Sequence, residues 1–291
     1  MANPVKRKLV VCGGNGFLGS RICKAAVGRG WDVVSISRSG EPNWSSVTSS
    51  PNAPTWSRSV SWEKANILHP SSYAYLLDGA DAVVHSMGIL LEADYKGVLQ
   101  GKESIVSGLQ RAFSSSKQGS QNPLEQREGS DAEPQERDGQ VTYELMNRDS
   151  AILLAREAHA HQVPAFVFIS AAAGAPVLPA RYIETKRAAE STIASAFPSM
   201  RNIFVRPAFL YDESRPITMP LAAATGVGAL ANSLTGGRLT WLMGAGGIKP
   251  LKANTVADAV VEAVDEESVK GTLEVPRIEE LATSAWRKNM L

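Results

Sequence analysis

The chain has 291 residues, of which 44% are hydrophobic and 20% are charged, which is the composition of a globular protein long enough to bury a large core. Its formal net charge of +1 argues against nucleic acid as a partner. Two cysteines, Cys12 and Cys23, indicate a reducing compartment rather than a disulfide framework, and the four histidines are not spaced as metal ligands.

A glycine-rich turn near the N-terminus is the first informative feature. Residues 8–12 are a short apolar run typical of a buried parallel strand, and residues 18–26 have helical spacing. Between them the glycines follow the pattern Gly13-x-x-Gly16-x-x-Gly19. A strand, a glycine turn and a helix together favour a dinucleotide site over a turn without a ligand, because the backbone and the helix N-terminus can approach a pyrophosphate. The residues expected to contact it are Gly13, Asn15, Gly16, Phe17 and Leu18.

The second predicted strand, residues 31–37, ends in Ser37-Arg38-Ser39. Dinucleotide folds often carry an acidic residue at this place, where it binds the adenosine ribose. An arginine suits a 2′-phosphate instead, because a guanidinium can bind it through two hydrogen bonds. We therefore expect Ser37 and Arg38 to favour NADP(H) over NAD(H); the alternative is a surface arginine in a turn.

The middle of the chain alternates short strands with loops. Residues 41–57 are rich in Ser, Pro, Asn and Thr and are expected to form a loop. Strands are predicted at 60–62 and at 81–85, and the second runs into Ser86-Met87-Gly88. Residues 114–140 are too poor in large apolar side chains to offset their ordering entropy, which predicts a disordered insertion within the domain.

The rest of the chain continues the alternation. The predicted elements are a helix at 141–162, a strand at 165–170, a helix from 179, a strand at 202–206, a helix at 217–234, a helix at 256–265 and a strand at 272–275. This order predicts a doubly wound parallel α/β sheet, a Rossmann fold, over residues 1–212. Residues 213–291 are expected to form a small C-terminal substrate or lid subdomain packed on it.

The helix predicted at 217–234 is apolar, but proline, glycine and threonine residues argue against a membrane span. Its larger apolar residues fall on roughly one face, which predicts a helix packed on the core. A substrate lid or a contact with a membrane surface is the alternative.

Tyr182 and Lys186 are four residues apart on a predicted helix, so both side chains share one face. A lysine cation beside a phenol favours the phenolate and would lower the tyrosine pKa from about 10. The pair is therefore a candidate general acid/base for hydride transfer to or from a carbonyl group.

Taken in order, these motifs resemble the atypical extended short-chain dehydrogenase/reductase family over residues 8–212. Within it, the glycine turn, the compact turn at residues 170–173 and the segment after Tyr182 resemble a branch of mitochondrial proteins. That branch holds the NADPH-carrying accessory subunits of respiratory complex I and fungal proteins implicated in ubiquinone biosynthesis. The resemblance implies a matrix location at the inner-membrane surface, a mitochondrial protein complex and an apolar, quinone-like small molecule. The sequence itself shows no clear transit peptide.

The resemblance also implies roles for further residues. Asn66 and Ile67 match the positions that contact the adenine, and Ser86, Met87 and Gly88 match the turn beneath the ribose and pyrophosphate. Lys186 would bond the nicotinamide ribose. The segment from Arg206 to Tyr211 resembles a signature near the nicotinamide, through Pro207 and Phe209.

One departure from the family leaves the reaction open. Active members carry a Ser or Thr hydroxyl two residues beyond the first serine after the fifth strand, and here that position is Ala172. Ser170 is the only nearby substitute, so the catalytic candidates are Tyr182, Lys186 and Ser170. We expect either an NADP(H)-dependent oxidoreductase or a non-catalytic NADPH-binding subunit of a mitochondrial inner-membrane complex. An ordinary sugar-nucleotide epimerase is a distant third alternative.

Overall fold

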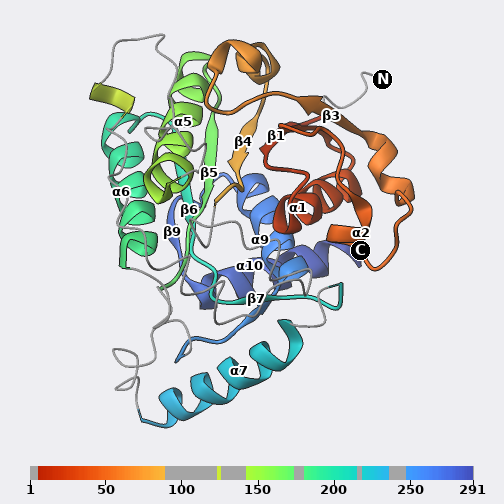
Figure 1. The fold of residues 1–291 in the computed structure, drawn as a ribbon, viewed down its shortest axis with the longest axis vertical. Coiled ribbons are helices and arrows are strands. Elements are labelled where there is room, and N and C mark those ends of the chain that lie inside the picture. Colours follow the sequence, from red (N-terminus) through yellow and green to blue (C-terminus); the bar gives the residue numbers. More distant parts are fainter. Residues whose placement is uncertain are drawn as a thin grey trace.

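The structure, a computed structural model, describes residues 6–88, 123–125, 142–173, 180–214, 218–235 and 247–290. Its centre is a seven-stranded sheet in the order β3-β2-β1-β4-β5-β6-β9, in which every neighbouring pair is parallel (Figure 1). The strands are β1 (Lys8–Cys12), β2 (Asp32–Ser37), β3 (Val60–Lys64), β4 (Ala82–His85), β5 (Ala165–Ile169), β6 (Arg201–Val205) and β9 (Gly271–Leu273). The predicted doubly wound α/β fold is confirmed.

Helices cover both faces of this sheet (Figure 1). One face shares a hydrophobic core with α1 (Phe17–Gly28), α9 (Ala253–Asp265) and α10 (Val275–Asn289), and the other with α5 (Ser150–Ala160) and α6 (Ala180–Ala196). β1 shows the division, because Leu9 and Val11 belong to the first core, whereas Val10 and Cys12 belong to the second. Successive side chains of a strand point to opposite faces, so an apolar run of this kind requires cover on both.

The region predicted as a loop at 41–57 contains a short helix, α2 (Trp44–Val47). Trp44 packs edge-on against Trp56 and Trp62, with ring centroids 5.6 and 5.8 Å away. Burial of three aromatic rings holds this polar segment against the edge of the sheet. The composition of residues 41–57 predicted a loop, because composition does not show that Trp44 packs against Trp56 and Trp62.

Short irregular elements complete the described chain. The helix predicted at 141–162 begins with a π-helical segment, η5 (Glu144–Asp149), before it becomes α5. Single 3₁₀ turns are η1 (Thr55–Ser59), η2 (Pro70–Ser72), η3 (Ala74–Leu77) and η4 (Pro123–Glu125). Apart from η4, the insertion predicted at 114–140 lies outside the described residues.

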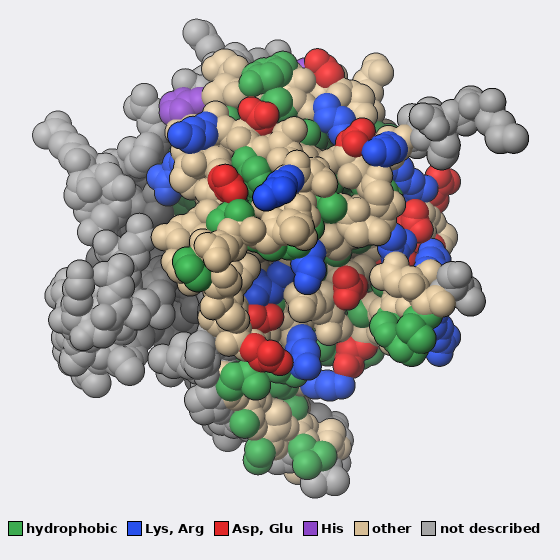
Figure 2. Space-filling view, turned by 90° about the vertical axis from the view of Figure 1, so that its right-hand side faces the viewer, with side chains coloured by type: hydrophobic (Ala, Val, Ile, Leu, Met, Phe, Trp, Pro, Cys, Tyr) green, Lys and Arg blue, Asp and Glu red, His purple; other side chains and the backbone are tan. Residues whose placement is uncertain are grey.

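The elements that follow β6 belong to two different parts of the structure. β7 (Leu210–Tyr211) and β8 (Leu251–Lys252) pair in a small second sheet, and α7 (Thr218–Leu234) projects from the lower end of the molecule (Figures 1 and 2). In contrast, β9 pairs with β6 in the main sheet, and α9 packs against α1 and α10. The Rossmann architecture therefore extends beyond residue 212, where we placed its boundary, and takes in β9, α9 and α10.

Candidate functional site

The glycine turn joins β1 to α1 with little room for side chains. Gly13 has a φ of +84°, and its carbonyl oxygen accepts a hydrogen bond of 2.9 Å from the Gly16 N–H. A Cβ atom on Gly19 would lie 2.1 Å from that same oxygen, so α1 packs directly on the turn. Gly16 caps α1 without a side-chain hydrogen bond. The helix N-terminus therefore presents backbone N–H groups and the positive end of its dipole, which fits a phosphate group.

The turn after β4 lies against the glycine turn, because β1 and β4 are neighbours and their carboxyl ends share one edge. Ser86 Oγ donates to the Cys12 carbonyl at 3.0 Å, and a Cβ atom on Gly13 would lie 2.7 Å from Met87 Cγ. The structure thus brings the predicted residues of both turns together at this edge.

The end of β2 forms a second wall of the site. Ser37 is buried, and its hydroxyl donates to the Gly40 carbonyl at 2.8 Å, which shapes the turn that exposes Arg38. Asn15 reaches this turn through a 2.7 Å hydrogen bond from Nδ2 to Ser39 Oγ. The side chain of Ser37 is therefore used within the protein, while Arg38 faces solvent beside the glycine turn.

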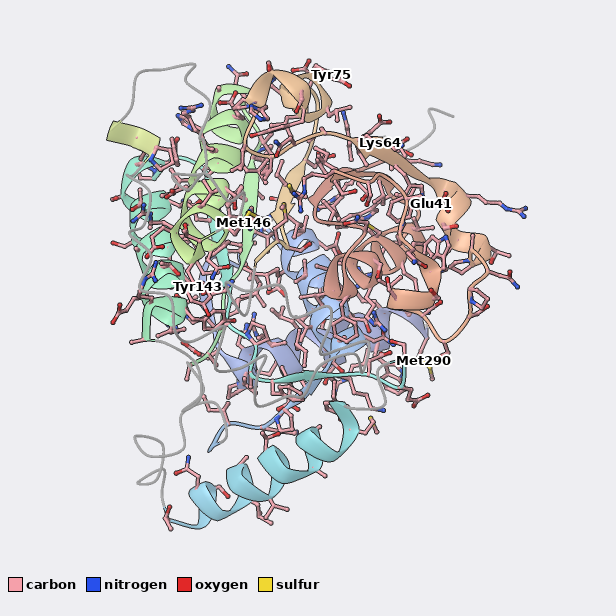
Figure 3. The ribbon with its side chains drawn as sticks, viewed as in Figure 1. Glu41, Lys64, Tyr75, Tyr143, Met146 and Met290 are labelled. Carbon is pink, nitrogen blue, oxygen red and sulfur yellow. The ribbon has the colours of Figure 1, made fainter. Side chains whose placement is uncertain are left out.

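Lys64 is a basic residue of this edge that the sequence did not single out. It ends β3 and is the register partner of Ser37, so it comes next to the turn that carries Arg38 (Figure 3). Both side chains are exposed, and within the described residues neither forms an ion pair. The pairing of β2 with β3 could have identified Lys64, because the last residues of neighbouring parallel strands meet at one edge of the sheet.

Two predicted adenine contacts are partly engaged within the protein. Asn66 Oδ1 accepts a hydrogen bond of 3.3 Å from the Leu68 N–H, closing a local turn, and Ile67 is buried in the core between the sheet and α5. The Asn66 N–H donates to Ser72 Oγ and its carbonyl accepts from the His69 N–H, so the group of Asn66 best placed to meet a ligand is the Nδ2 amino group of its half-buried side chain.

The first residues of α1 are likewise packed within the protein. The Arg21 guanidinium lies 4.3 Å from the centroid of the Phe17 ring, and Leu18 is buried in the core. Arg21 Nη2 also pairs with Asp212 Oδ1 at 2.5 Å. Burial alone would raise the pKa of Asp212, but hydrogen bonds from Arg21 and Ser214 lower it. This pair fixes the start of α1 to the segment after β7.

Lys186 lies at the centre of the site, on α6. Its side chain is buried, and Nζ donates to the Ile169 carbonyl at 2.9 Å. A Cβ atom on Gly88 would lie 3.4 Å from Nζ and 3.0 Å from Asn147 Oδ1, so these three residues meet where β4 and β5 end. Burial lowers the pKa of Lys186 to about 8, although Glu190 acts to raise it.

Tyr182 differs from its predicted state. Lys186 Nζ lies 5.9 Å from the centroid of its ring, and the Tyr143 ring packs against it with centroids 6.0 Å apart (Figure 3). Burial raises the pKa of Tyr182 to about 12, although Arg187 acts to lower it. The predicted lowering is wrong for this arrangement, because desolvation of the phenolate outweighs the nearby cations. The hydroxyl is protonated at neutral pH.

Arg187 holds the hydroxyl oxygen of Ser170 and the backbone beside it. Arg187 Nη1 donates to Ser170 Oγ at 3.1 Å, and Nη2 donates to the carbonyls of Ala171 and Ala172 at 2.7 and 3.0 Å. The Ala172 N–H donates to the Pro207 carbonyl at 2.8 Å. The turn after β5 is thereby fixed between α6 and the end of β6. Phe209 lies just beyond, and its carbonyl accepts from the Leu251 N–H at 2.9 Å, so the predicted nicotinamide segment leads into β7, which pairs with β8.

A charge network centred on the buried Glu190 supports this turn. Glu190, on α6, pairs with Arg187 at 2.8 Å and also with Arg206, at the end of β6. Arg206 pairs in turn with Glu274 at 2.8 Å. The sequence did not single out Arg187, Glu190 or Glu274. Arg187 and Glu190 are three residues apart on one helix, and this spacing could have predicted their ion pair.

His85 is a second buried group that the sequence did not assign. Its Nε2 lies 2.9 Å from Ser150 Oγ, and that hydroxyl donates to the Met146 carbonyl at 2.8 Å. Nε2 therefore donates, which leaves Nδ1 unprotonated and, within the described residues, without a hydrogen-bond partner. Burial and the nearby Lys186 lower the pKa of His85 to about 3.

Sequence comparison identifies a family and several relatives of this chain. Residues 9–94 match the model of the NAD dependent epimerase/dehydratase family. Over 221 residues the chain is 40% identical to MIOREX complex component 2 of Saccharomyces cerevisiae, which covers 72% of this chain and 74% of the yeast protein. A stretch of 88 residues, 30% of this chain, is 41% identical to a chloroplastic protein of Arabidopsis thaliana and covers 27% of it.

Solved structures share the fold at low identity. The Bordetella bronchiseptica enzyme WbmH in complex with NAD+ has a TM-score of 0.54 at 16% identity, over 93% of this chain and 75% of that one. WbmG from the same organism, in complex with NAD and UDP, has a TM-score of 0.54 at 13% identity, over 98% of this chain and 79% of that one. At these identities the likeness is one of architecture.

Proposed function

We infer that this chain is an NADP(H)-binding accessory protein. The chain belongs to the NAD-dependent epimerase/dehydratase class of short-chain dehydrogenases, together with its homologue, yeast MIOREX complex component 2. We place it in a mitochondrial complex at the matrix side of the inner membrane, in ubiquinone biosynthesis. The cofactor half of this proposal is carried by one observation, the close packing of Gly13, Gly16 and Gly19. The mitochondrial half rests on the yeast homologue, a complex component by name, and on the sequence resemblance.

Different residues of the site would bind different parts of the dinucleotide. The glycine turn and the N-terminus of α1 would hold the pyrophosphate through backbone N–H groups. Arg38 and Lys64, both exposed at the ends of β2 and β3, would hold the 2′-phosphate. Lys186 and Asn147, beside Gly88, would bind the nicotinamide ribose. A bound NADPH supplies a hydride; the remaining question is whether this chain can direct it to a substrate.

Three features favour an accessory role. Ala172 carries no hydroxyl, and the Ser170 hydroxyl oxygen is held by Arg187 in the turn after β5. Tyr182 has a raised pKa, so it is not prepared to act as a phenolate base. The site therefore keeps its binding groups while the usual arrangement for polarising a substrate oxygen is missing.

A second candidate function is reduction of an apolar, quinone-like carbonyl compound. It is favoured by Tyr182 and Lys186, which share one end of α6, near Gly88. A tyrosine that is protonated at neutral pH could donate its proton to a carbonyl oxygen as a general acid.

Calorimetric titration with NADPH and NADH tests the proposal. We expect NADPH to bind at least tenfold more tightly, and Arg38→Ala or Lys64→Ala to weaken NADPH binding about tenfold while leaving NADH binding unchanged. Arg58→Ala, at another exposed arginine of the same region, is the matched control. Equal affinities for the two nucleotides, or equal losses in all three variants, would contradict the proposed preference.

A further inference from the structure

The described side chains of α7 reverse the polarity that is usual for a helix on a water-soluble surface. Among them, Ala222 and Asn232 are buried, and Asn232 Nδ2 donates to the Gly247 carbonyl at 3.1 Å. The large apolar side chains described on this helix point outward instead, with Val227 70% and Leu230 63% exposed. A surface helix normally buries its apolar stripe and exposes polar residues.

The exposed apolar residues form one continuous stripe. Met219, Ala223, Val227 and Leu230 are exposed and follow one another at intervals of four, four and three, so they share a single face of the helix. We call these four residues the α7 face. It lies at the end of the molecule farthest from η3 (Figure 1), and Figure 2 shows hydrophobic and uncharged surface at this end, with charged side chains above it.

The charge of the surrounding chain is one-sided. Residues 214–257 contain four basic residues and no Asp or Glu, although the whole chain has a net charge of only +1. Two of these basic residues, Lys249 and Lys252, lie in the described segment on which α7 packs, and both are exposed. Lys249 Nζ also pairs with Glu279 Oε1 at 2.5 Å, so Lys252 carries more of the argument. The remaining two, Arg215 and Arg238, bracket the helix in sequence.

We propose that the α7 face rests on the surface of a bilayer that contains anionic lipids, with Lys249 and Lys252 close to the headgroups. An apolar helix face with cations beside it inserts to the depth of the acyl boundary, and each cation near an anionic surface adds to binding. The proposed contact is with the surface alone: in the described part of the chain, no helix has the length and hydropathy to cross a membrane. This inference builds on the membrane location proposed above, but it does not depend on the dinucleotide.

Flotation of the full chain with vesicles tests the inference, without added nucleotide. We expect it to float with vesicles of phosphatidylcholine and phosphatidylglycerol, and less with pure phosphatidylcholine. Val227→Asp with Leu230→Asp should lower the partition coefficient at least tenfold, and Lys252→Glu about fivefold or more. The matched control is Tyr75→Asp, because Tyr75 is 62% exposed at the opposite end of the molecule (Figure 3).

The outcomes separate this inference from the rest. NADPH titration and thermal unfolding of the Val227→Asp/Leu230→Asp variant show whether it stays folded, which the exposure of both side chains predicts. A wild-type chain that does not float, or that floats equally well in all variants, overturns the bilayer contact. So does concentration-dependent self-association that the double variant abolishes, because the α7 face would then bind a second copy. Failure of nucleotide binding with normal flotation contradicts only the proposed cofactor.

Discussion

The guanidinium of Arg187 and the hydroxyl of Ser170 are joined by a hydrogen bond of 3.1 Å between α6 and the turn after β5. The same guanidinium also binds two carbonyls of that turn, so one side chain fixes three consecutive residues. Lys186, the preceding residue of α6, binds the Ile169 carbonyl. Two neighbouring cations of α6 thus stabilise the segment where a catalytic hydroxyl would otherwise stand.

Arg187→Met should destabilise the protein by about 1–3 kcal/mol, because two carbonyls and a hydroxyl lose their donor. Urea unfolding measures this change. Arg277→Met is the control: that arginine is 44% exposed and pairs with Glu280 at 3.0 Å, so its loss should cost less than about 0.5 kcal/mol. Equal effects of the two substitutions would show that Arg187 does not hold the turn.

Gly19→Ala should weaken NADPH binding more than tenfold and destabilise the fold by about 1–3 kcal/mol, because its Cβ would meet the Gly13 carbonyl oxygen at 2.1 Å. Gly28 lies on the same helix with nothing within 4 Å of its Cβ position. Gly28→Ala should therefore keep normal binding and raise stability by about 0.5–1 kcal/mol. Titration calorimetry and urea unfolding of both variants check the pair; normal NADPH binding by Gly19→Ala would contradict the role given to the glycine turn.

The low pKa of His85 predicts a loss of stability in acid. The folded protein keeps His85 neutral down to about pH 3, whereas the unfolded chain protonates it near pH 6.5. Between these values the unfolded state binds more protons, so stability falls as the pH falls, by about 2 kcal/mol from pH 7 to pH 5.

His85→Gln should remove this part of the pH dependence, since Gln can still donate to Ser150 and does not titrate. Urea unfolding of both proteins at pH 7 and pH 5 measures the difference. If the wild type and the variant lose the same stability between these two pH values, His85 is not the group responsible.

Tyr182→Phe should leave NADPH binding within about twofold, because the aromatic ring and its packing on Tyr143 are kept while only the hydroxyl is removed. If the chain is an accessory protein, this variant should fully restore function in a strain that lacks the gene. Tyr75→Phe, at an exposed tyrosine far from the site, is the control. Normal binding without rescue would favour the oxidoreductase, since general acid–base groups contribute about 10²–10⁴-fold in rate.

Most of the sheet could be predicted from the sequence, because buried parallel strands such as β1 and β5 are short apolar runs bounded by turns. β9 was placed one residue late and assigned to a separate subdomain, since its three residues do not show their partner strand. α10 was missed altogether.

The candidate site, like the sheet, was predictable only where local sequence determines the structure. Contacts set by local sequence, such as the glycine turn, were predictable. The partner of Ser170 and the pKa of Tyr182 were not, because both depend on how α6 packs against β5. On α7 the expected packing on the core is wrong for Val227 and Leu230, which are exposed: spacing shows that apolar residues share a face but not what that face meets.

The layer formed by α1, α9 and α10 has a consequence for biosynthesis. α1 leaves the ribosome long before α9, β9 and α10, yet they bury one face of the sheet together. A nascent chain that has reached only residue 250 would expose the apolar side chains of Leu9 and Val11 to water. Folding of this face must therefore wait until α9, β9 and α10 have been synthesised, and until then chaperones have a hydrophobic surface to bind.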